Sequence, residues 1–257
     1  MTNTDSVDRA VVAWHGAIQA FCDLQPKGAS KIGAHGTRMI TSGTPVAVLN
    51  GVISATREPD VTELSAFAAS YANDTLPWSI QLRGDRDHPA IAKVAAERGL
   101  TKTFTLPFMV KRLGESAMSV PASATMSVRR VPKEDHDVYN RVLAAGFEAP
   151  EHIFRGFSAP NVLSAQGMTA YLVEEAGTPV ATAFGARVND YVGVFNIATP
   201  PPYRLRGYAR AATAAVLRDA YAGGARTAFL HCTPAGRAVY ESLGFATAEN
   251  WLIYVAP

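Results

Sequence analysis

A short turn between a predicted strand and a predicted helix constrains the fold of this chain more than any other feature. The strand over 191–198 is followed by three consecutive prolines, which stop regular strand pairing. Arg204, Gly207 and Ala209 come next, in the pattern Arg-x-x-Gly-x-Ala, and open a helix over 208–222. A pair of glycines directly follows that helix and is suited to a left-handed turn that ends it. The sequence therefore predicts a strand, a compact turn and a helix in direct succession.

The chemistry of this turn suits an anion. The first turn of a helix has unpaired N–H groups and the positive end of the helix dipole. Gly207 and Ala209 are small enough for a pyrophosphate to approach, and Arg204 and Arg206 add positive charge. From these residues alone, a tight turn with two solvated arginines is an open alternative. The sequence has no P-loop motif, and the dinucleotide fingerprint fails because Leu205 stands in place of its first glycine.

The sequence predicts two halves, each made of helices and strands. The phrase Gly-Thr-Pro-Val-Ala occurs at 43–47 and again at 177–181, which favours an internal duplication. We expect a first domain over 1–113, a linker over 114–123, where Gly, Ser, Ala and Pro cluster, and a second domain over 124–257.

The expected elements of the first half are helices over 7–24, 61–71 and 90–98 and strands over 37–40, 46–53, 78–82 and 104–110. Those of the second half are helices over 133–144, 150–163, 208–222 and 235–243 and strands over 125–130, 169–174, 179–188, 191–198, 227–232 and 250–255.

Two motifs of the second half resemble those of the GNAT acetyltransferase superfamily. The turn from Arg204 to Ala209 matches the family's acetyl-CoA-binding pattern, Arg/Gln-x-x-Gly-x-Gly/Ala. Tyr240, followed by Leu-Gly-Phe at 243–245, matches its closing motif, and the order of elements over 125–255 fits its fold. The resemblance implies an α/β (α+β) chain of two tandem GNAT-like domains, each a mixed, mostly antiparallel central sheet flanked by helices.

The resemblance also implies which residues hold acetyl-CoA, or another acyl-CoA, as co-substrate. With Arg204 beside them, the residues whose main-chain amides would bind the pyrophosphate are Leu205, Arg206, Gly207, Tyr208, Ala209 and Arg210. The backbone of Ile197, Ala198 and Thr199 would pair with the pantetheine arm as an added strand. One amide there would polarise the thioester carbonyl.

The closing motif implies the remaining contacts to the donor. Tyr240 would give a proton to the leaving thiolate or hold the thioester sulfur. Thr233 stands where the family often has an asparagine that bonds the pantetheine, so the hydroxyl of Thr233 is a candidate ligand in its place.

The first half is expected to have lost this chemistry. Aligning Gly99 with Gly244, which each close a predicted helix, places Ala95 at the position of Tyr240. The segment that follows the strand over 46–53 carries no Arg-x-x-Gly-x-Ala, and Asp60 or Thr62 is placed to cap the next helix. We therefore expect a degenerate first domain, from which Trp78 or Arg83 would at most line part of the acceptor site.

An amine acceptor must lose a proton before it attacks a thioester, so a general base is expected. Glu148 is the first candidate and His231 the second, while Asn196 can hold a water but cannot take a proton. The aromatic residues expected to line an apolar acceptor pocket are Phe147, Phe154, Phe157 and Phe195.

Composition excludes several other classes of protein. Hydrophobic residues make up 48% of the 257 residues and the formal net charge is +2, so neither disorder nor a strong field for nucleic acid or membranes is indicated. The two cysteines and six histidines show no metal-binding spacing, and no metal is expected. A chain without a recognisable secretory signal or spanning segment is expected in the cytoplasm.

The sequence thus predicts an acyl-CoA-dependent N-acyltransferase. An acetyl or other acyl group would pass by direct attack to a primary amine, most simply that of a small molecule. A carrier-protein thioester as donor and a non-catalytic acyl-CoA-binding regulatory module are the alternatives. Because the pseudo-repeat can supply its own partner sheet, a monomer is expected.

Overall fold

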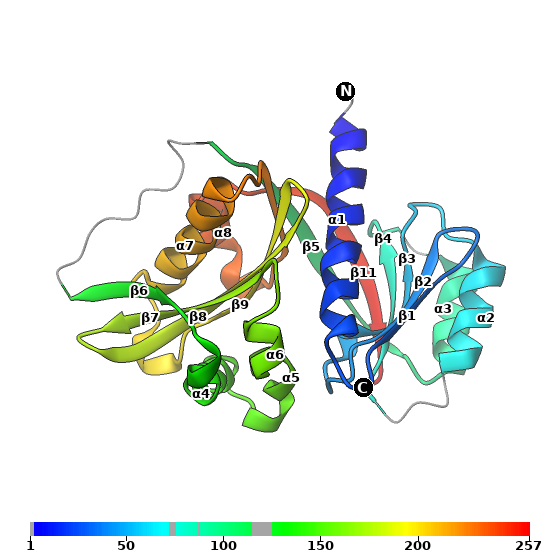
Figure 1. Cartoon of the computed structure of the whole chain (residues 1–257). Helices are drawn as coiled ribbons and strands as arrows, with labels where there is room; N and C mark the ends of the chain where they lie inside the picture. Colours follow the sequence, from blue (N-terminus) through cyan, green and yellow to red (C-terminus); the bar gives the residue numbers. More distant parts are fainter. Residues whose placement is uncertain (1–2, 72–75, 87, 115–124) are drawn as a thin grey trace. The chain divides into compact units, whose positions relative to one another are not determined.

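The computed structural model describes residues 3–71, 76–86, 88–114 and 125–257 (Figure 1). The chain forms two compact units. Unit 1 consists of Met1–Ala17 and Met109–Ala246, and unit 2 of Ile18–Phe108 and Thr247–Pro257. The chain passes from one unit to the other within the first helix, within strand β5 and at the start of the last strand. None of the described helices is long and apolar enough to cross a membrane.

Unit 1 is built on a mixed sheet in which most neighbours are antiparallel. From one edge inward the strands are β6 (Met126–Arg130), β7 (Met168–Glu175), β8 (Thr178–Val188), β9 (Tyr191–Ala198) and β10 (Thr227–His231). Neighbours from β6 to β9 run antiparallel, whereas β9 and β10 run parallel. The end of β5 (Lys102–Arg112) lies beside β10.

Helices cover both faces of this sheet, as Figure 1 shows. The helices of one face are α7 (Tyr208–Ala222) and α8 (Arg237–Ser242), and those of the other are α4 (His136–Phe147), α5 (Arg155–Ser158) and α6 (Pro160–Leu163). The 3-10 helices of this unit are η3 (Lys133–Asp135), η4 (Glu151–Ile153), η5 (Pro201–Tyr203) and η6 (Pro234–Gly236). Small alanines on α7 pack on the strand valines, which lets the helix lie close to the sheet.

Unit 2 is built on a second mixed sheet, most of whose strands are short. Its order is β1 (Ala29–Ile32), β2 (Thr37–Thr41), β3 (Asn50–Ser54), β4 (Ser79–Arg83), β11 (Ala246–Val255) and the beginning of β5. Only β3 and β4 run parallel among the neighbours whose pairing is described. The helices are α2 (Val61–Tyr71), α3 (Pro89–Glu97) and the end of α1 (Asn3–Asp23), and η1 (Ala47–Leu49) precedes β3. Apolar residues of α2 and α3 pack with those of β3 and β4.

The two units differ from the expected domains at both ends of the chain. The start of α1 belongs to unit 1, although the first domain was expected over 1–113. Strand β11 pairs with β4 of unit 2, with Trp251 opposite Arg83, although it lies inside the range 124–257 expected for the second domain. This pairing completes the sheet of unit 2 and buries Trp251 and Ile253 fully. The expected linker over 114–123 lies outside the described residues except for Gly114.

Most elements agree with expectation, including the short strands β2, β4 and β10, whose bounds differ by at most one residue from those expected. The bounds expected for α2, β9 and α7 coincide with those of the structure. The single helix expected over 150–163 is instead divided into η4, α5 and α6, because Pro160 lacks a donor and disfavours helical backbone at Ala159. Strand β1 was not expected, since its four residues are mostly exposed and give no apolar alternation.

The repeated phrase does not mark equivalent strands. Its second copy leads into β8, whereas its first copy leads through η1 into β3. In topology β3 corresponds to β9 rather than to β8, because β3 and β9 each cross over a helix to a parallel neighbour.

Better evidence of likeness between the units is the way in which α3 and α8 end. Gly99 and Gly244 both have a positive φ, +76° and +83°. The following amides donate back to Ala95 O and Tyr240 O respectively, at 2.9 and 3.0 Å. These are the bonds of a glycine-terminated helix. Ala95 therefore occupies in unit 2 the position that Tyr240 occupies in unit 1.

The C-terminal strand of unit 2 is held by a buried ion pair, which gives a test of this fold. Arg83 Nε lies 2.7 Å from Glu249 Oε1, and these side chains are 4% and 8% exposed. Glu249→Ala leaves Arg83 buried without its carboxylate, so we expect a loss of about 3–5 kcal/mol in the free energy of unfolding. Urea denaturation measures this loss. Glu241→Ala removes the exposed partner of Arg237 and should cost about 0.5 kcal/mol or less; equal losses in the two variants would contradict the pairing.

Candidate functional site

The parallel strands β9 and β10 of unit 1 pair over only part of their length. The ladder joins Tyr191–Gly193 of β9 to Thr227–Phe229 of β10, in that register. Strand β9 continues to Ala198 and β10 to His231 beyond this ladder. The second half of β9 therefore has backbone groups that can pair with an extended ligand.

A bulge interrupts the pairing of β9 with its other neighbour, β8, a short distance beyond this ladder. Thr182 of β8 lies opposite Ala198, while Phe184 lies opposite Phe195, so β9 carries one extra residue in this stretch. Asn196 adopts a left-handed φ of +52°, and its carbonyl accepts a hydrogen bond from Thr182 Oγ1 at 2.7 Å. A bulge of this kind takes a peptide group out of the ladder and re-aims it. The structure thus brings the expected residues Asn196, Ile197 and Ala198 together at the point where the strands part.

The turn after β9 ends at a helix start without a side-chain cap. Leu205 and Gly207 both have a left-handed φ, +64° and +85°, and Gly207 is the N-cap of α7. The first amide of the helix that bonds one turn back is that of Ala211, which donates to Gly207 O at 3.0 Å. No side chain caps Gly207. The amides of the first turn are therefore open to an anion.

The corresponding helix of unit 2 begins differently. Asp60 precedes α2, and its Oδ1 accepts a hydrogen bond from Glu63 N at 2.8 Å. This is the cap expected for Asp60 in the sequence, and it places a carboxylate where an anion would otherwise bind. Of these two helix starts, that of α7 has no side-chain cap, whereas that of α2 is occupied by a carboxylate of the chain itself.

Arg204 and Glu148, predicted as separate parts of the site, contact each other. Arg204 Nη2 lies 2.6 Å from Glu148 Oε1 in an exposed ion pair and also donates to Gly146 O at 3.0 Å. Arg204 Nε donates to Thr199 O at 3.1 Å. The guanidinium is thus engaged by the ends of α4 and β9.

Tyr240 lies in the core of unit 1, beside the expected ligand Thr233. Its ring meets that of Phe245 edge to face at a centroid distance of 6.0 Å, and it packs on Gly236, where a Cβ would approach the ring to 2.9 Å. Burial raises the pKa of the Tyr240 phenol, and nearby Cys232 adds to the effect. Tyr240 is therefore a neutral hydrogen-bond donor at neutral pH, as its expected role requires.

His231 lies at the end of β10 against a residue that sequence reasoning missed. Trp14 of α1 meets its ring edge to face at 5.3 Å, and His231 Nε2 has no contact with solvent. Burial lowers the pKa of His231 to about 3, so the imidazole is neutral at neutral pH. Because Trp14 is distant in sequence, only its place on the apolar face of a helix could have indicated a buried role.

The four phenylalanines expected to line one acceptor pocket form two groups. Phe147 and Phe154 stack with ring centroids 5.3 Å apart, and Phe157 lies 6.2 Å from Phe154. Phe195 instead meets Phe229 within the sheet, at 6.3 Å. Phe147 is 47% exposed, so the first group presents an aromatic surface beside the end of α4.

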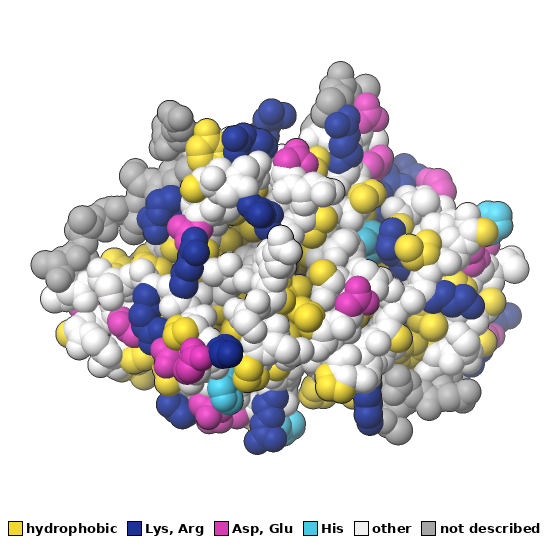
Figure 2. All heavy atoms as spheres, viewed as in Figure 1, with side chains coloured by type: hydrophobic (Ala, Val, Ile, Leu, Met, Phe, Trp, Pro, Cys, Tyr) yellow, Lys and Arg dark blue, Asp and Glu magenta, His cyan; other side chains and the backbone are white. Residues whose placement is uncertain are grey.

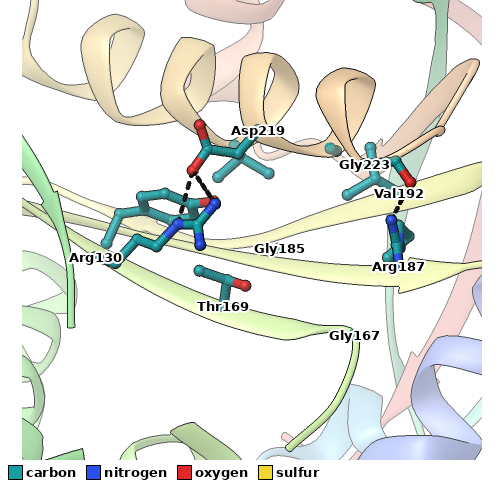
Figure 3. A pocket seen from close by; sticks show the side chains of 11 residues that line it. Arg130, Gly167, Thr169, Gly185, Arg187, Val192, Asp219 and Gly223 are labelled. Carbon is teal, nitrogen blue, oxygen red and sulfur yellow. Dashed lines mark hydrogen bonds and ion pairs between the residues drawn. The ribbon is translucent and has the colours of Figure 1, made fainter. Parts of the chain in front are cut away.

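A cavity of about 200 Å³ lies at the far end of α7 from Gly207. Figure 3 shows Arg130 turned to Asp219 and Arg187 turned to the carbonyl of Gly223. Tyr171 also donates to Asp219, at 3.1 Å. Arg130 and Asp219 are thus paired with each other and Arg187 is bound to a backbone carbonyl, and the cavity is smaller than ordinary ligand pockets.

Surface charge is mixed. On the face shown in Figure 2, Lys and Arg side chains of the described residues are interspersed with Asp and Glu. Among the described residues, no group of three or more His, Cys, Asp or Glu side chains is arranged to hold a metal ion.

Comparison with known proteins agrees with this geometry. Residues 136–245 match the model of the Acetyltransferase (GNAT) family, and this range contains the bulged strand, the open helix start and Tyr240. The segment 136–245 is therefore similar in sequence to the acyltransferase domain of GNAT proteins. No functionally curated protein matches the sequence of this chain.

Solved structures share the fold over nearly the whole chain. A GCN5-related N-acetyltransferase from Kribbella flavida is similar at a TM-score of 0.69 and 19% identity, over 97% of this chain and 95% of that one. A functionally unknown protein from Staphylococcus epidermidis is similar at 0.68 and 11% identity, over 92% and 96%. A putative GNAT-family acetyltransferase from Novosphingobium aromaticivorans gives 0.55 and 17%, over 87% and 89%.

The close approach of α4 to β9 can be tested at Gly146. A Cβ at this position would lie 2.6 Å from Ala198 Cβ and 2.8 Å from Thr199 N, so the backbones must separate to admit it. We expect Gly146→Ala to lower the free energy of unfolding by about 1–3 kcal/mol in urea denaturation. Gly114→Ala, where a Cβ meets nothing within 4 Å, is the control and should be near neutral. A neutral Gly146→Ala would show that this contact is not tight.

The burial of His231 predicts a pH dependence of stability. Its pKa is lower in the folded than in the unfolded chain, so below about pH 6.5 the unfolded state binds the extra proton. The free energy of unfolding should be unaffected by His231 above that pH and fall by up to about 1.4 kcal/mol per unit as the pH drops towards the folded pKa. Urea denaturation between pH 5 and 7.5 measures the slope. His231→Gln should flatten it, and an unchanged slope in that variant would refute the assignment.

Proposed function

We propose that unit 1 binds an acyl-CoA and transfers its acyl group to a primary amine. The observation that carries this proposal is the open start of α7 at Gly207, next to a strand that leaves its parallel neighbour β10 after Gly193 and is bulged against β8 beyond it. Together they offer amides for two phosphates and a free strand edge for the pantetheine arm.

The donor would lie along elements that are close in sequence. The amides of Leu205 to Arg210 would bind the pyrophosphate at the positive end of α7. The backbone of Ile197, Ala198 and Thr199 would pair with the pantetheine amides. Thr199 Oγ1 supports this placement, since it is buried and has no hydrogen-bond partner in the described structure.

Transfer would proceed by direct attack of the amine on the thioester carbon. Negative charge then develops on the carbonyl oxygen, and an amide freed by the bulge at Asn196 is the group that would stabilise it. As the C–S bond breaks, the thiolate leaves beside Tyr240. The raised pKa of Tyr240 keeps its phenol protonated, so that it can donate a hydrogen bond, but makes it a weaker acid. Holding the sulfur is therefore favoured over complete proton transfer to it.

The base is assigned between the two expected candidates, Glu148 and His231, by their surroundings. A histidine whose pKa is about 3 takes few protons at neutral pH, which disfavours His231. Asn196 has no basic group. We therefore assign the proton of the acceptor ammonium to Glu148, directly or through a water.

Unit 2 is proposed to be a degenerate copy of the same fold. The parallel pair β3 and β4 around α2 corresponds to β9 and β10 around α7. Its helix start is filled by Asp60, and Ala95 replaces the tyrosine. A unit with these two changes can neither bind a pyrophosphate in the same way nor hold the sulfur.

A carrier-protein thioester is a second candidate donor. Leu205, at the turn that would hold the pyrophosphate, is fully exposed although its backbone is left-handed. An exposed apolar side chain at this turn could contact a carrier protein. Saturation of the reaction by acetyl-CoA alone would argue against this donor.

Donor binding is tested by thermal unfolding with acetyl-CoA and by calorimetry. A ligand of the native state present at 100 times its Kd should add about 2.7 kcal/mol to the free energy of unfolding. Gly207→Glu should abolish the shift, because a carboxylate repels the phosphates. Gly224→Glu is the matched control, since Gly224 also has a positive φ with nothing within 4 Å but lies after the end of α7. Failure of the parent chain to bind would exclude free acetyl-CoA as donor.

Turnover is tested with Tyr240→Phe, by release of CoA thiol in the presence of tyramine, spermidine or kanamycin as probe amines. Loss of the phenol should lower kcat by about 10²-fold or more and leave the Kd for acetyl-CoA unchanged. The free energy of unfolding of the variant serves as the control for folding. If acetyl-CoA binds but no probe is acetylated by either protein, a non-catalytic binding module would be favoured.

A further inference from the structure

We propose that Arg204 is a positioning residue that fixes the acceptor side of the site against the donor side, rather than a ligand of the phosphates. This inference rests on the proposed function. It concerns one side chain that joins the two segments between which the reaction would take place.

The contacts of Arg204 carry the proposal. Its Nε donates to Thr199 O at 3.1 Å, at the end of β9. Its Nη2 donates to Gly146 O at 3.0 Å and pairs with Glu148 Oε1 at 2.6 Å, at the end of α4. The planar guanidinium thus ties three acceptors on two segments, which a point charge such as lysine cannot reproduce.

Packing at the same place shows that the two segments meet backbone to backbone. Gly146 leaves no space for a Cβ against Ala198 and Thr199. Arg204 spans this junction and donates to a carbonyl on each side of it. Its removal would release the last turn of α4 from the end of β9.

At the end of α4, a residue other than glycine also adopts an unusual backbone conformation. Glu148 is the C-cap of α4 and has a left-handed φ of +54°, a conformation that glycine normally adopts. Its ion pair with Arg204 is exposed, at 44% and 59% of the two side chains, and such pairs add little stability. The pair is therefore better suited to placing the carboxylate than to holding the fold.

Phe147 connects this junction to the acceptor surface. It directly precedes Glu148, is half-exposed, and stacks on Phe154. A shift at Glu148 would move both the proposed base and the aromatic ring beside it. Small displacements of reacting groups cost rate, so the effect of losing Arg204 should fall on the acceptor.

Arg206 provides a matched comparison. It lies in the same turn and carries the same charge, and its guanidinium lies near the Tyr208 hydroxyl, which Glu175 also faces. We expect the side chain that contacts the phosphates to belong to a residue that faces this helix start. Arg206→Ala should therefore weaken acetyl-CoA binding, about tenfold, without disturbing α4.

The experiment compares the parent chain with Arg204→Lys, Arg204→Ala and Arg206→Ala. Hydrogen exchange is followed in the segment 145–158, acetyl-CoA binding by calorimetry, and KM for whichever probe amine is acetylated. Both Arg204 variants should raise exchange in 145–158 and the amine KM by about tenfold or more. Arg204→Lys keeps the charge, so the Kd for acetyl-CoA should stay within about threefold of the parent value.

Two outcomes overturn the inference. One is unchanged exchange in 145–158 for both Arg204 variants. The other is a loss of acetyl-CoA affinity in Arg204→Ala as large as that in Arg206→Ala, which would make Arg204 a phosphate ligand. Hydrogen exchange needs no ligand. If the parent chain binds no acetyl-CoA, the proposed function fails while the exchange result still decides whether Arg204 positions α4.

Discussion

The structure of unit 1 depends on the parting of two parallel strands. Three residues of β9 pair with β10, and then a bulge and a run of prolines take β9 away from its neighbour. Backbone groups left without a ladder partner must bond to something else. Here the loss of sheet pairing coincides with a helix start that has no cap. Unpaired backbone groups, which would weaken an ordinary sheet, thus lie together at a place where an extended ligand with an anionic end can bond to them.

The two units share part of their topology but differ at the helix start where unit 1 has its candidate site. Both have a helix that crosses between parallel strands and a second helix closed by a left-handed glycine. In unit 2 the aspartate before α2 bonds an amide of the first turn. The carboxylate of Asp60 in unit 2 thus occupies the place where unit 1 would bind an anion from solution. Packing and strand pairing stabilise the fold of unit 2, which needs no open helix start.

Much of unit 1 could be predicted because its signals are local. The strand over 191–198 and the helix over 208–222 have clear periodicity and clear stops, and their bounds agree with the structure. The C-terminal strand could not be placed in the same way. Its apolar pattern shows that it is a strand but not that its partner is β4, with Glu249 bound to Arg83. The contacts of Trp14 with His231 and of Arg204 with Glu148 join residues far apart in the chain, and no spacing rule predicts them.

Burial decides how protons can be handled in this site. It raises the pKa of Tyr240 and lowers that of His231, so both side chains are uncharged at neutral pH. Neither can then balance the positive charge of an acceptor ammonium. The carboxylate of Glu148 is exposed, and its neighbour Arg204 already neutralises part of its charge. An incoming ammonium would therefore have to share Glu148 with Arg204, and the position of that guanidinium sets how strongly the acceptor can be held while it gives up its proton.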